Sequence, residues 1–504
     1  MPAPPTTNRP APTIVFPAAA ILLAIASAVA LTGCRNSALK PNLPQIYALP
    51  AARREGKPPV IFIPGILGSR LVNRRTGETV WPDLRVDHDE IALPISSPVL
   101  TQNTDDLAAT EIVEEVKLGP FIPETAIYGP LLNALERYGG YRRASFNAPP
   151  SGGDSDTLYP FAYDWRRDIV ESARALSCAI EDLKRRLGRP DLRFDIVAHS
   201  MGGLVARYYA MYGERDVLDG HGACPDWSGS RNLNKVVMIG TPNAGSMNAF
   251  RVLLHGFSAT AGARPSAGFW RRIKRKLPIA RVGPRTTFTA PAVYQLFPPN
   301  GQARFFDADL KPLPVDLYDV ETWRRFKWSV AFDEALRRHE LERLIKRLGP
   351  DAARAESLRR LAERERFLRV VLRRAAAFHN ALAVACPPPV SLRFFFIGGD
   401  CTPTLDGAII LNGGARRTIF NASNFPGETW SKRKAMELIF TPGDGTVTRH
   451  SLFGHTLNER PAVAVPIAMR STLVGTALLC DSHNGLSRDR EMHNNLLTSL
   501  LINR

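Results

Sequence analysis

Short apolar runs alternate with longer amphipathic stretches along most of the chain. Five runs are nearly continuous, rich in β-branched or aromatic residues and bounded by Gly, Pro or Asn: residues 60–63, 194–197, 236–239, 394–397 and 476–479. Strands of this kind are typical of a parallel sheet that is covered by helices on both faces. The pattern therefore predicts the α/β class with a mostly parallel central sheet.

The pattern changes to basic, amphipathic helical sequence over residues 246–387. Residues 269–277 and 328–385 are its clearest helical parts, with Gly349 and Pro350 ending one helix and Asp351 able to cap the next. Because predicted strands lie on both sides, this segment is an insertion, which we call the cap. The alternative is a solvated helical hairpin whose Arg and Glu side chains simply face water.

An apolar run at the N-terminus ends in the tetrapeptide LTGC, whose last residue is Cys34. This tetrapeptide looks like a bacterial lipobox, in which the cysteine becomes the lipidated N-terminus of the mature protein. The alternative is an uncleaved transmembrane helix, which Pro17 and the lipobox disfavour. Arg35 replaces the Asp that marks inner-membrane retention, so the expected address is the outer membrane of a bacterial envelope.

These patterns predict five segments. They are a lipoprotein signal peptide (1–33), a Pro- and Ala-rich tether after the anchor (34–57), a first part of the core (58–245), the helical cap (246–387) and a second part of the core (388–504).

The chain is basic, with a formal net charge of +17. Such a charge suits an anionic partner, either phospholipid headgroups or nucleic acid. The sequence has no zinc-finger spacing, no aromatic RNA-binding signature and no helix-turn-helix candidate, so we expect a membrane surface and no nucleic acid as the partner.

Five cysteines remain besides Cys34, so at least one thiol stays unpaired if the others form disulfides after export. Cys386 and Cys401 flank a predicted strand and could pair, although connectivity does not follow from sequence. No cysteine spacing resembles a zinc site, and we expect neither a metal nor a cofactor.

Residues 194–203, FDIVAHSMGG, run from a predicted strand straight into a predicted helix. A nucleophile elbow holds a serine on such a strained turn and needs small residues two positions before and after it. Ala198 and Gly202 meet this need, although Ala198 replaces the first glycine of the usual G-x-S-x-G motif. Ser200 is therefore the candidate nucleophile of a hydrolase.

A serine nucleophile needs a histidine base and a carboxylate that orients it. In the α/β-hydrolase fold, which the elbow, the parallel strands and the inserted cap predict, these residues follow in the order Ser, Asp, His. Asp444 lies on a Gly-bounded turn, GDGTV, after the strand at 394–397 and is the candidate acid. Asp400 and Asp406 follow the same strand and are the competing carboxylates.

His483 lies in the loop after the last predicted strand and is the candidate base. His450 and His455 precede that strand. His493 belongs to a helix expected to face solvent, and His199 is expected to point into the packing of the elbow.

Two backbone N–H groups should bind the oxyanion of the tetrahedral intermediate. Met201, directly after the nucleophile, supplies one. The glycine-rich loop at 64–69, PGILGS, supplies the other from Leu67 or Ile66.

Together these motifs resemble the family of lecithin:cholesterol acyltransferase, lysosomal phospholipase A2 and phospholipid:diacylglycerol acyltransferase. The matching segments are 60–71, the YDWR motif at 163–166, the elbow at 198–202, the turn at 240–246, YQLFP at 294–298 and the acid turn at 443–447.

The resemblance implies a serine that takes an acyl chain from a phospholipid and passes it to water or an alcohol, with Leu67 as an oxyanion donor. Asp164, Trp165 and Arg166 are then expected behind the catalytic groups, or, on a plainer interpretation, as a buried ion pair with a packed indole. Trp81, Phe269 and Trp270 are candidates for acyl-binding or membrane-contacting surfaces or for ordinary core aromatics.

Three functions remain open at this point. The first is acyl transfer or phospholipase action on a lipid substrate. The second is a general triacylglycerol lipase or carboxylesterase, and the third is a non-catalytic envelope protein that binds anionic surfaces through its basic cap.

Overall fold

A computed structural model describes residues 40–48, 56–82, 91–116, 125–150, 153–219, 224–259, 280–384, 386–411, 418–454 and 473–501. The elements below belong to one compact unit that begins at Leu43. The signal peptide, Cys34, Pro17, Arg35, His455, Phe269 and Trp270 lie outside the described residues. In the described part of the chain, no helix is long and apolar enough to cross a membrane.

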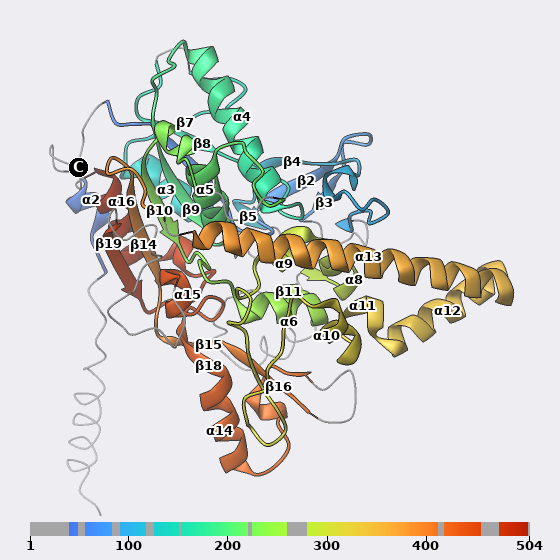
Figure 1. Ribbon diagram of the computed structural model, residues 1–504. Coiled ribbons are helices and arrows are strands. Elements are labelled where there is room, and N and C mark those ends of the chain that lie inside the picture. Colours follow the sequence, from blue (N-terminus) through green and yellow to red (C-terminus); the bar gives the residue numbers. More distant parts are fainter. Residues whose placement is uncertain are drawn as a thin grey trace, which may run out of the picture. The chain divides into compact units, whose positions relative to one another are not determined.

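A seven-stranded sheet in the order β19-β14-β10-β9-β1-β8-β7 forms the centre of this unit (Figure 1). Every pair of neighbouring strands in it is parallel. The predicted α/β class with a mostly parallel sheet is thus confirmed. The strands are β1 (Val60–Ile63), β7 (Arg142–Arg143), β8 (Thr157–Pro160), β9 (Phe194–His199), β10 (Leu233–Ile239), β14 (Arg393–Gly399) and β19 (Leu473–Leu479).

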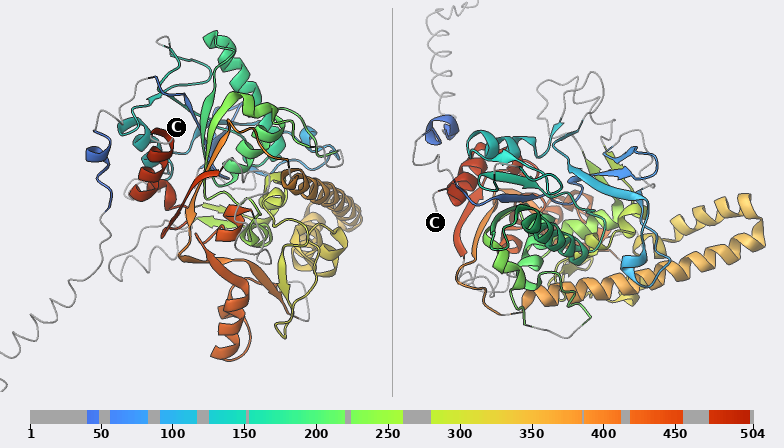
Figure 2. Two further views of the ribbon diagram at one scale, coloured as in Figure 1. Left: turned by 60° about the vertical axis from the view of Figure 1, so that its left-hand side comes forward. Right: turned by 90° about the horizontal axis from the view of Figure 1, so that it is seen from above.

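The two faces of the sheet are covered by different helices (Figure 2). Alternate side chains of a strand point to opposite faces, and the buried residues accordingly separate into two apolar clusters. One cluster contains α4 (Ile169–Leu187) and α5 (Met201–Tyr212), and the other contains α3 (Gly129–Arg137) and α16 (Arg490–Leu501). Because the central sheet is buried on both faces, most of its strands are continuous apolar runs in the sequence.

A small antiparallel sheet follows β1 in the chain. It consists of β2 (Ser69–Asn73), β3 (Thr79–Trp81) and β4 (Leu107–Ile112), with β2 in the middle. Its central strand begins where the predicted oxyanion loop ends, so this sheet fixes one end of that loop.

The predicted cap is mostly helical. Its described elements are α6 (Met247–His255), β11 (Phe257–Ala259), β12 (Ala280–Val282), α8 (Pro284–Phe288), α9 (Pro291–Gln295), β13 (Arg304–Phe306), α10 (Val320–Arg325), α11 (Ser329–Phe332), α12 (Glu334–Leu348) and α13 (Pro350–Ala383).

Helices α12 and α13 form a hairpin that projects away from the central sheet (Figures 1 and 2). The chain reverses at Gly349, whose φ of 79° suits glycine, and Pro350 occupies the first helical position. Asp351 lies in the first turn of α13, but no side chain caps this helix. The expected capping role of Asp351 is therefore wrong, because the backbone turn at Gly349 already defines the start of the helix.

The hairpin is solvated at its outer end and packed at its base. Helix α12 buries only Glu340 and Leu344. In α13 the buried residues lie between Phe367 and Leu382, apart from Ala353 near its start. The outer part therefore matches the alternative of a solvated hairpin, whereas the base of α13 packs against the core as a cap would.

A further inserted segment lies between β14 and Asp444. It contains β15 (Thr402–Leu405), β16 (Gly407–Ile410), β17 (Thr418–Ile419), α14 (Thr429–Ile439) and β18 (Phe440–Gly443). Strand β13 of the cap pairs in parallel with β16, so one small sheet spans the predicted boundary at residue 387.

Part of the segment predicted as a tether is packed against the core. Residues Leu43–Ile46 form helix α2, and the side chains of Leu43 and Tyr47 are buried. The Tyr47 hydroxyl donates to the backbone oxygen of Asn494 at 3.0 Å and lies 3.2 Å from the hydroxyl of Thr498, both on α16. Leu43 and Tyr47 are four residues apart and thus share one face of a helical turn.

Two disulfides join Cys224 to Cys386 and Cys401 to Cys480, and Cys178 is an exposed free thiol. The pairing considered for Cys386 and Cys401 is therefore wrong. These residues flank β14, and seven extended residues span about 23 Å, far beyond the reach of a disulfide.

Candidate active site

Ser200 occupies a strained turn between β9 and α5. Its φ of 53° and ψ of −125° are unfavourable for a residue with a side chain. The Ser200 N–H donates to the carbonyl of Ile239 at 2.7 Å, which ties the turn to the neighbouring strand β10. A Cβ at Gly202 would lie 2.5 Å from the Pro64 carbonyl oxygen, so only glycine fits at this position of the motif.

The structure brings Ser200, His483 and Asp444 into one line of hydrogen bonds. His483 Nε2 lies 2.9 Å from Ser200 Oγ, and His483 Nδ1 lies 2.7 Å from Asp444 Oδ2. The backbone N–H of His483 donates to the carbonyl of Asp444 at 2.8 Å, so the base is held by backbone as well as side chain. All three residues are buried.

The Asp444 carboxyl is held in its ionised form. Burial alone would raise its pKa, but the imidazole of His483 and the N–H groups of Val447 and Thr446 lower the pKa further than burial raises it. The two N–H groups donate to Oδ1 at 2.7 and 2.9 Å, which leaves Oδ2 for His483. An ionised carboxylate in this position favours protonation of the imidazole during a proton transfer.

Gly240, directly after β10, leaves room for the imidazole ring of His483. Its φ is 58°, and a Cβ there would lie 3.1 Å from the His483 ring and 3.3 Å from Asp444 Oδ2. Any side chain at this turn would therefore displace the line of catalytic groups.

The loop that follows β1 lies against the nucleophile. A Cβ at Gly65 would be 2.9 Å from the Cβ of Ser200, so the backbone of the loop touches the elbow directly. Leu67 has a positive φ of 65°, and its carbonyl accepts a hydrogen bond from Trp81 Nε1 at 2.9 Å. The Met201 N–H is the first of α5 and has no acceptor within its helix. Met201 thus follows Ser200 directly, and Leu67 belongs to the loop whose Gly65 touches Ser200.

The YDWR motif holds the same loop from behind. The Tyr163 hydroxyl donates to the Pro64 carbonyl at 2.9 Å, and Trp165 Nε1 donates to the Ser69 carbonyl at 3.2 Å. The rings of Trp165 and Trp81 pack edge to face with centroids 5.7 Å apart. Trp81 is therefore a core aromatic that positions the loop.

Asp164 and Arg166 form a buried ion pair. Arg166 is 1% exposed and donates to Asp164 and to Asp105, with N–O distances of 2.7 and 2.6 Å. Burial lowers the pKa of Arg166, but the two carboxylates raise it above its usual value. The plainer interpretation of the motif fits these contacts, which join Arg166 to Asp164 and Asp105.

The competing carboxylates have other partners. Asp400 pairs with Arg449 at 3.2 Å, and Asp406 pairs with Arg304 at 2.8 Å and with His450 at 3.1 Å.

Two competing histidines of the described residues are buried and hydrogen-bonded elsewhere. His493 is buried and its Nε2 lies 3.0 Å from the Ser487 carbonyl, so the expectation that it faces solvent is wrong, because α16 packs this side onto the sheet. His199 is buried behind the elbow, as expected.

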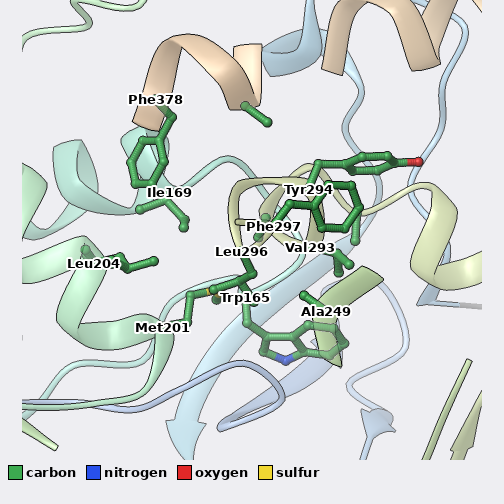
Figure 3. Close-up of a cluster of buried hydrophobic side chains, with 14 of the residues drawn as sticks. Trp165, Ile169, Met201, Leu204, Ala249, Val293, Tyr294, Leu296, Phe297 and Phe378 are labelled. Carbon is green, nitrogen blue, oxygen red and sulfur yellow. The ribbon is translucent and has the colours of Figure 1, made fainter. Parts of the chain in front are cut away.

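Apolar side chains of the cap meet the helix that carries the elbow. Figure 3 shows Met201 and Leu204 of α5 near Trp165, with Val293, Leu296 and Phe297 from the cap around them. Gln295 anchors this part of the cap, because its side chain accepts from the Ile169 N–H at 2.8 Å and donates to Asp168 at 2.9 Å. The segment at 294–298 therefore fastens the cap to the start of α4.

Sequence reasoning missed Tyr128, whose hydroxyl lies 2.9 Å from the Gly65 nitrogen and 2.9 Å from His199 Nδ1. Its partners are distant in the chain, so no local pattern marks it.

Several solved structures are similar over most of the chain. The Tle4–Tli4 complex has 14% identity and a TM-score of 0.42, covering 89% of this chain and 100% of that one. The mature lipase BlEst2 of Bacillus licheniformis has 13% identity and a TM-score of 0.28, covering 88% and 92%. The lin2722 product of Listeria innocua has 11% identity and a TM-score of 0.32, covering 89% and 95%. No curated protein sequence matches the chain.

Residues 149–299 match the family model described as lecithin:cholesterol acyltransferase. The matched range contains the YDWR motif, the elbow and the segment at 294–298, and it ends before Asp444 and His483. Over residues 149–299, therefore, the resemblance to this family that the motifs predicted is confirmed, while the segments at 60–71 and 443–447 lie outside the match.

Proposed function

We propose that the chain is a serine-dependent enzyme that removes an acyl group from a lipid ester and transfers it to water or to an acceptor alcohol. The family match supports lipid ester hydrolysis or acyl transfer as the class of reaction. The observation that carries the proposal is the line of hydrogen bonds from Asp444 through His483 to Ser200.

In the first half-reaction, His483 Nε2 accepts the proton of the Ser200 hydroxyl while Oγ attacks the ester carbonyl. Asp444 accepts a hydrogen bond from His483 Nδ1 and stabilises the imidazolium that forms. The imidazolium then returns its proton to the leaving alcohol, and an acyl-enzyme remains on Ser200. In the second half-reaction, His483 takes a proton from water or an alcohol while the oxygen of that molecule attacks the acyl carbonyl. The imidazolium then returns the proton to Ser200 Oγ as the bond to the acyl group breaks.

The oxyanion formed in each step accepts hydrogen bonds from the backbone N–H groups of Leu67 and Met201. Trp81, Tyr163 and Trp165 bond to carbonyl groups of the loop around Leu67, so the donor is held in place before substrate arrives. Such preorganisation lets the charge develop without a reorganisation cost.

A lipid acyl chain suits the surroundings of the nucleophile. Met201 and Leu204 of α5 and Val293, Leu296 and Phe297 of the cap are apolar and belong to one cluster of packed side chains (Figure 3). Separation of these cap residues from α5 would expose an apolar surface next to Ser200, which is where an alkyl chain would bind.

The test uses defined phospholipid vesicles, with and without an added alcohol, and mass spectrometry of the lipids. The Ser200→Ala protein is the control. Lysophospholipid together with an ester of the added alcohol establishes acyl transfer, whereas free fatty acid alone establishes a phospholipase or lipase. If the Ser200→Ala protein forms the same products at the same rate, the proposal is wrong.

We also propose that Cys34 carries the lipid anchor of an envelope lipoprotein, which the LTGC tetrapeptide supports. Incorporation of a labelled fatty acid into the protein should be lost in the Cys34→Ser variant. Equal incorporation in both proteins would exclude this anchor.

A further inference from the structure

Two buried side chains that the mechanism does not use connect the oxyanion loop, the nucleophile elbow and the loop of His483. These side chains are Tyr128, at the start of α3, and His199, the last residue of β9. Both are 4% exposed. Their rings lie edge to face with centroids 5.5 Å apart.

The chemistry of the partners decides which atoms of Tyr128 and His199 donate and which accept a hydrogen bond. His199 Nε2 lies 3.2 Å from the carbonyl oxygen of His483, and a carbonyl can only accept, so Nε2 carries the proton. Burial and the nearby imidazole of His483 lower the pKa of His199 to about 3, so its ring is neutral and Nδ1 is an acceptor. The Tyr128 hydroxyl therefore donates to Nδ1, and its oxygen accepts the Gly65 N–H.

This assignment gives one continuous relay of three hydrogen bonds: Gly65 N–H to Tyr128 O, Tyr128 O–H to His199 Nδ1, and His199 Nε2–H to the His483 carbonyl. Burial raises the pKa of Tyr128 above its usual value, so its hydroxyl keeps the proton that the relay needs. Each donor and acceptor has one partner in the relay.

The relay joins segments that reach the site from three different strands. Gly65 belongs to the loop after β1. His199 is the last residue of β9 and directly precedes the nucleophile, and His483 lies in the loop after β19. The strand order places β19 three strands away from β9, so backbone pairing alone does not fix the base relative to the nucleophile. The His199 bond holds the carbonyl of His483, while Asp444 holds its N–H and its Nδ1.

We propose that Tyr128 and His199 are positioning residues that set the distance between the base, the nucleophile and the oxyanion loop. The inference rests on the proposed function, because it concerns the same catalytic groups. Loss of the Tyr128 hydroxyl leaves the Gly65 N–H and His199 Nδ1 unpaired, so the oxyanion loop and the base loop lose their common support. The acylation rate then falls. Substrate binding changes little, because it depends on the apolar side chains of Met201, Leu204, Val293, Leu296 and Phe297.

The test compares Tyr128→Phe with Tyr208→Phe. Tyr208 is a buried tyrosine whose hydroxyl also donates to one group, the Arg215 carbonyl at 3.1 Å, and accepts one backbone N–H, from Val217 at 3.1 Å. The two variants lose the same kind of hydroxyl, and only Tyr128 bonds to the catalytic segments. The readouts are thermal unfolding, kcat and KM for a soluble ester, and the rate at which a fluorophosphonate labels Ser200.

We expect Tyr128→Phe to lower kcat and the labelling rate about tenfold and to change KM by less than about twofold. Tyr208→Phe should lower the melting temperature by about as much as Tyr128→Phe does, and it should leave kcat and the labelling rate unchanged. His199→Gln keeps an N–H donor near the position of Nε2 and should label faster than His199→Phe, which has none.

Two failures can be told apart. If the wild-type protein does not react with the fluorophosphonate at a site that Ser200→Ala removes, the proposed function is wrong. If the wild type reacts and Tyr128→Phe reacts as fast as Tyr208→Phe, the proposed function stands and the relay is wrong.

Discussion

At the residue scale, the backbone of the loop after β1 lies unusually close to the side chain of Ser200. The loop after β1 passes so near the elbow that the Gly65 Cα faces the Ser200 side chain, with room for a hydrogen but not for a methyl group. Backbone conformation is not the constraint here, because Gly65 has no positive φ. The constraint is contact with the nucleophile.

Gly65→Ala should therefore lower kcat/KM about 100-fold, because its methyl group pushes the oxyanion loop or Ser200 out of position. The matched control is Gly283→Ala, since Gly283 also has a negative φ and a Cβ there would meet nothing within 4 Å. Steady-state kinetics on a soluble ester measure both. Wild-type kinetics for Gly65→Ala would show that the loop does not touch the reacting groups.

The residues of the candidate site differ in how well the sequence could predict them. Ser200, Asp444 and His483 each carry a local signal: a strand that runs into a helix, a Gly-bounded turn, and a loop after a strand. Tyr128 carries none, because its partners are 63 and 71 residues away. Its role depends on the fold that brings these positions together.

At the scale of elements, one buried glutamate joins the two helices of the projecting hairpin. Glu340 of α12 accepts hydrogen bonds from Arg360 at 2.9 Å and from Arg364 at 2.7 and 2.9 Å, both on α13. Burial raises the pKa of Glu340, but the two guanidinium groups lower it to about 2. The sequence indicated a helical hairpin and its turn, but it could not indicate which charges pair across it.

Glu340→Gln should loosen the hairpin at pH 7 by about 2 kcal/mol, measured as faster amide hydrogen exchange in α12 and the first half of α13. Because the pKa of Glu340 is lower in the folded protein, its contribution is complete above about pH 4.5 and is lost as the pH falls towards 2. The difference between variant and wild type should therefore shrink below about pH 4.5. A difference that stays constant from pH 7 to pH 3 would contradict the ion-pair account.

One disulfide ties the acid turn to the base loop. Cys480 follows β19 and precedes His483 by three residues, and Cys401 precedes Thr402, whose strand pairs with Gly443 next to Asp444. Both cysteines are exposed. The Cys224–Cys386 disulfide lies in other segments, before β10 and after α13.

The double variant Cys401→Ser/Cys480→Ser should lower kcat roughly tenfold, because both loops lose their covalent link. The variant Cys224→Ser/Cys386→Ser is the matched control and should keep its kcat. Activity assays with each protein at a temperature well below its melting point provide the comparison. Equal kcat in the two double variants would show that the Cys401–Cys480 link does not position the catalytic loops.

At the scale of the whole unit, the sequence predicted the composition of the sheet better than its order. Five of its seven strands are continuous apolar runs and were predicted, whereas β7 is two arginines and β8 begins with Thr157 and ends with Pro160, so neither is a continuous apolar run. The pairing of β1 with β8 depends on contacts across more than ninety residues, which periodicity cannot reveal. The packed position of α2 was missed for the same reason, since its partner helix α16 lies at the other end of the chain.

Tyr47→Ala should lower the free energy of unfolding by about 3 kcal/mol, because it removes a buried ring and its hydrogen bonds to α16. Ile46→Ala, at a neighbouring position that is 37% exposed, should change it by less than about 0.5 kcal/mol. Urea denaturation measures both. Equal stability of the two variants would show that α2 does not contribute to the folded unit.

Ser200 is proposed to carry the acyl group of a lipid ester during turnover. The first experiment is mass spectrometry of the peptide that contains Ser200, after phospholipid vesicles and the protein are mixed and quenched within the first turnover. We expect a fatty-acyl mass on Ser200 that forms in the wild type, is absent from Ser200→Ala and disappears when an alcohol acceptor is added. An acyl mass on another residue, or lipid cleavage by the Ser200→Ala protein, would contradict this proposal.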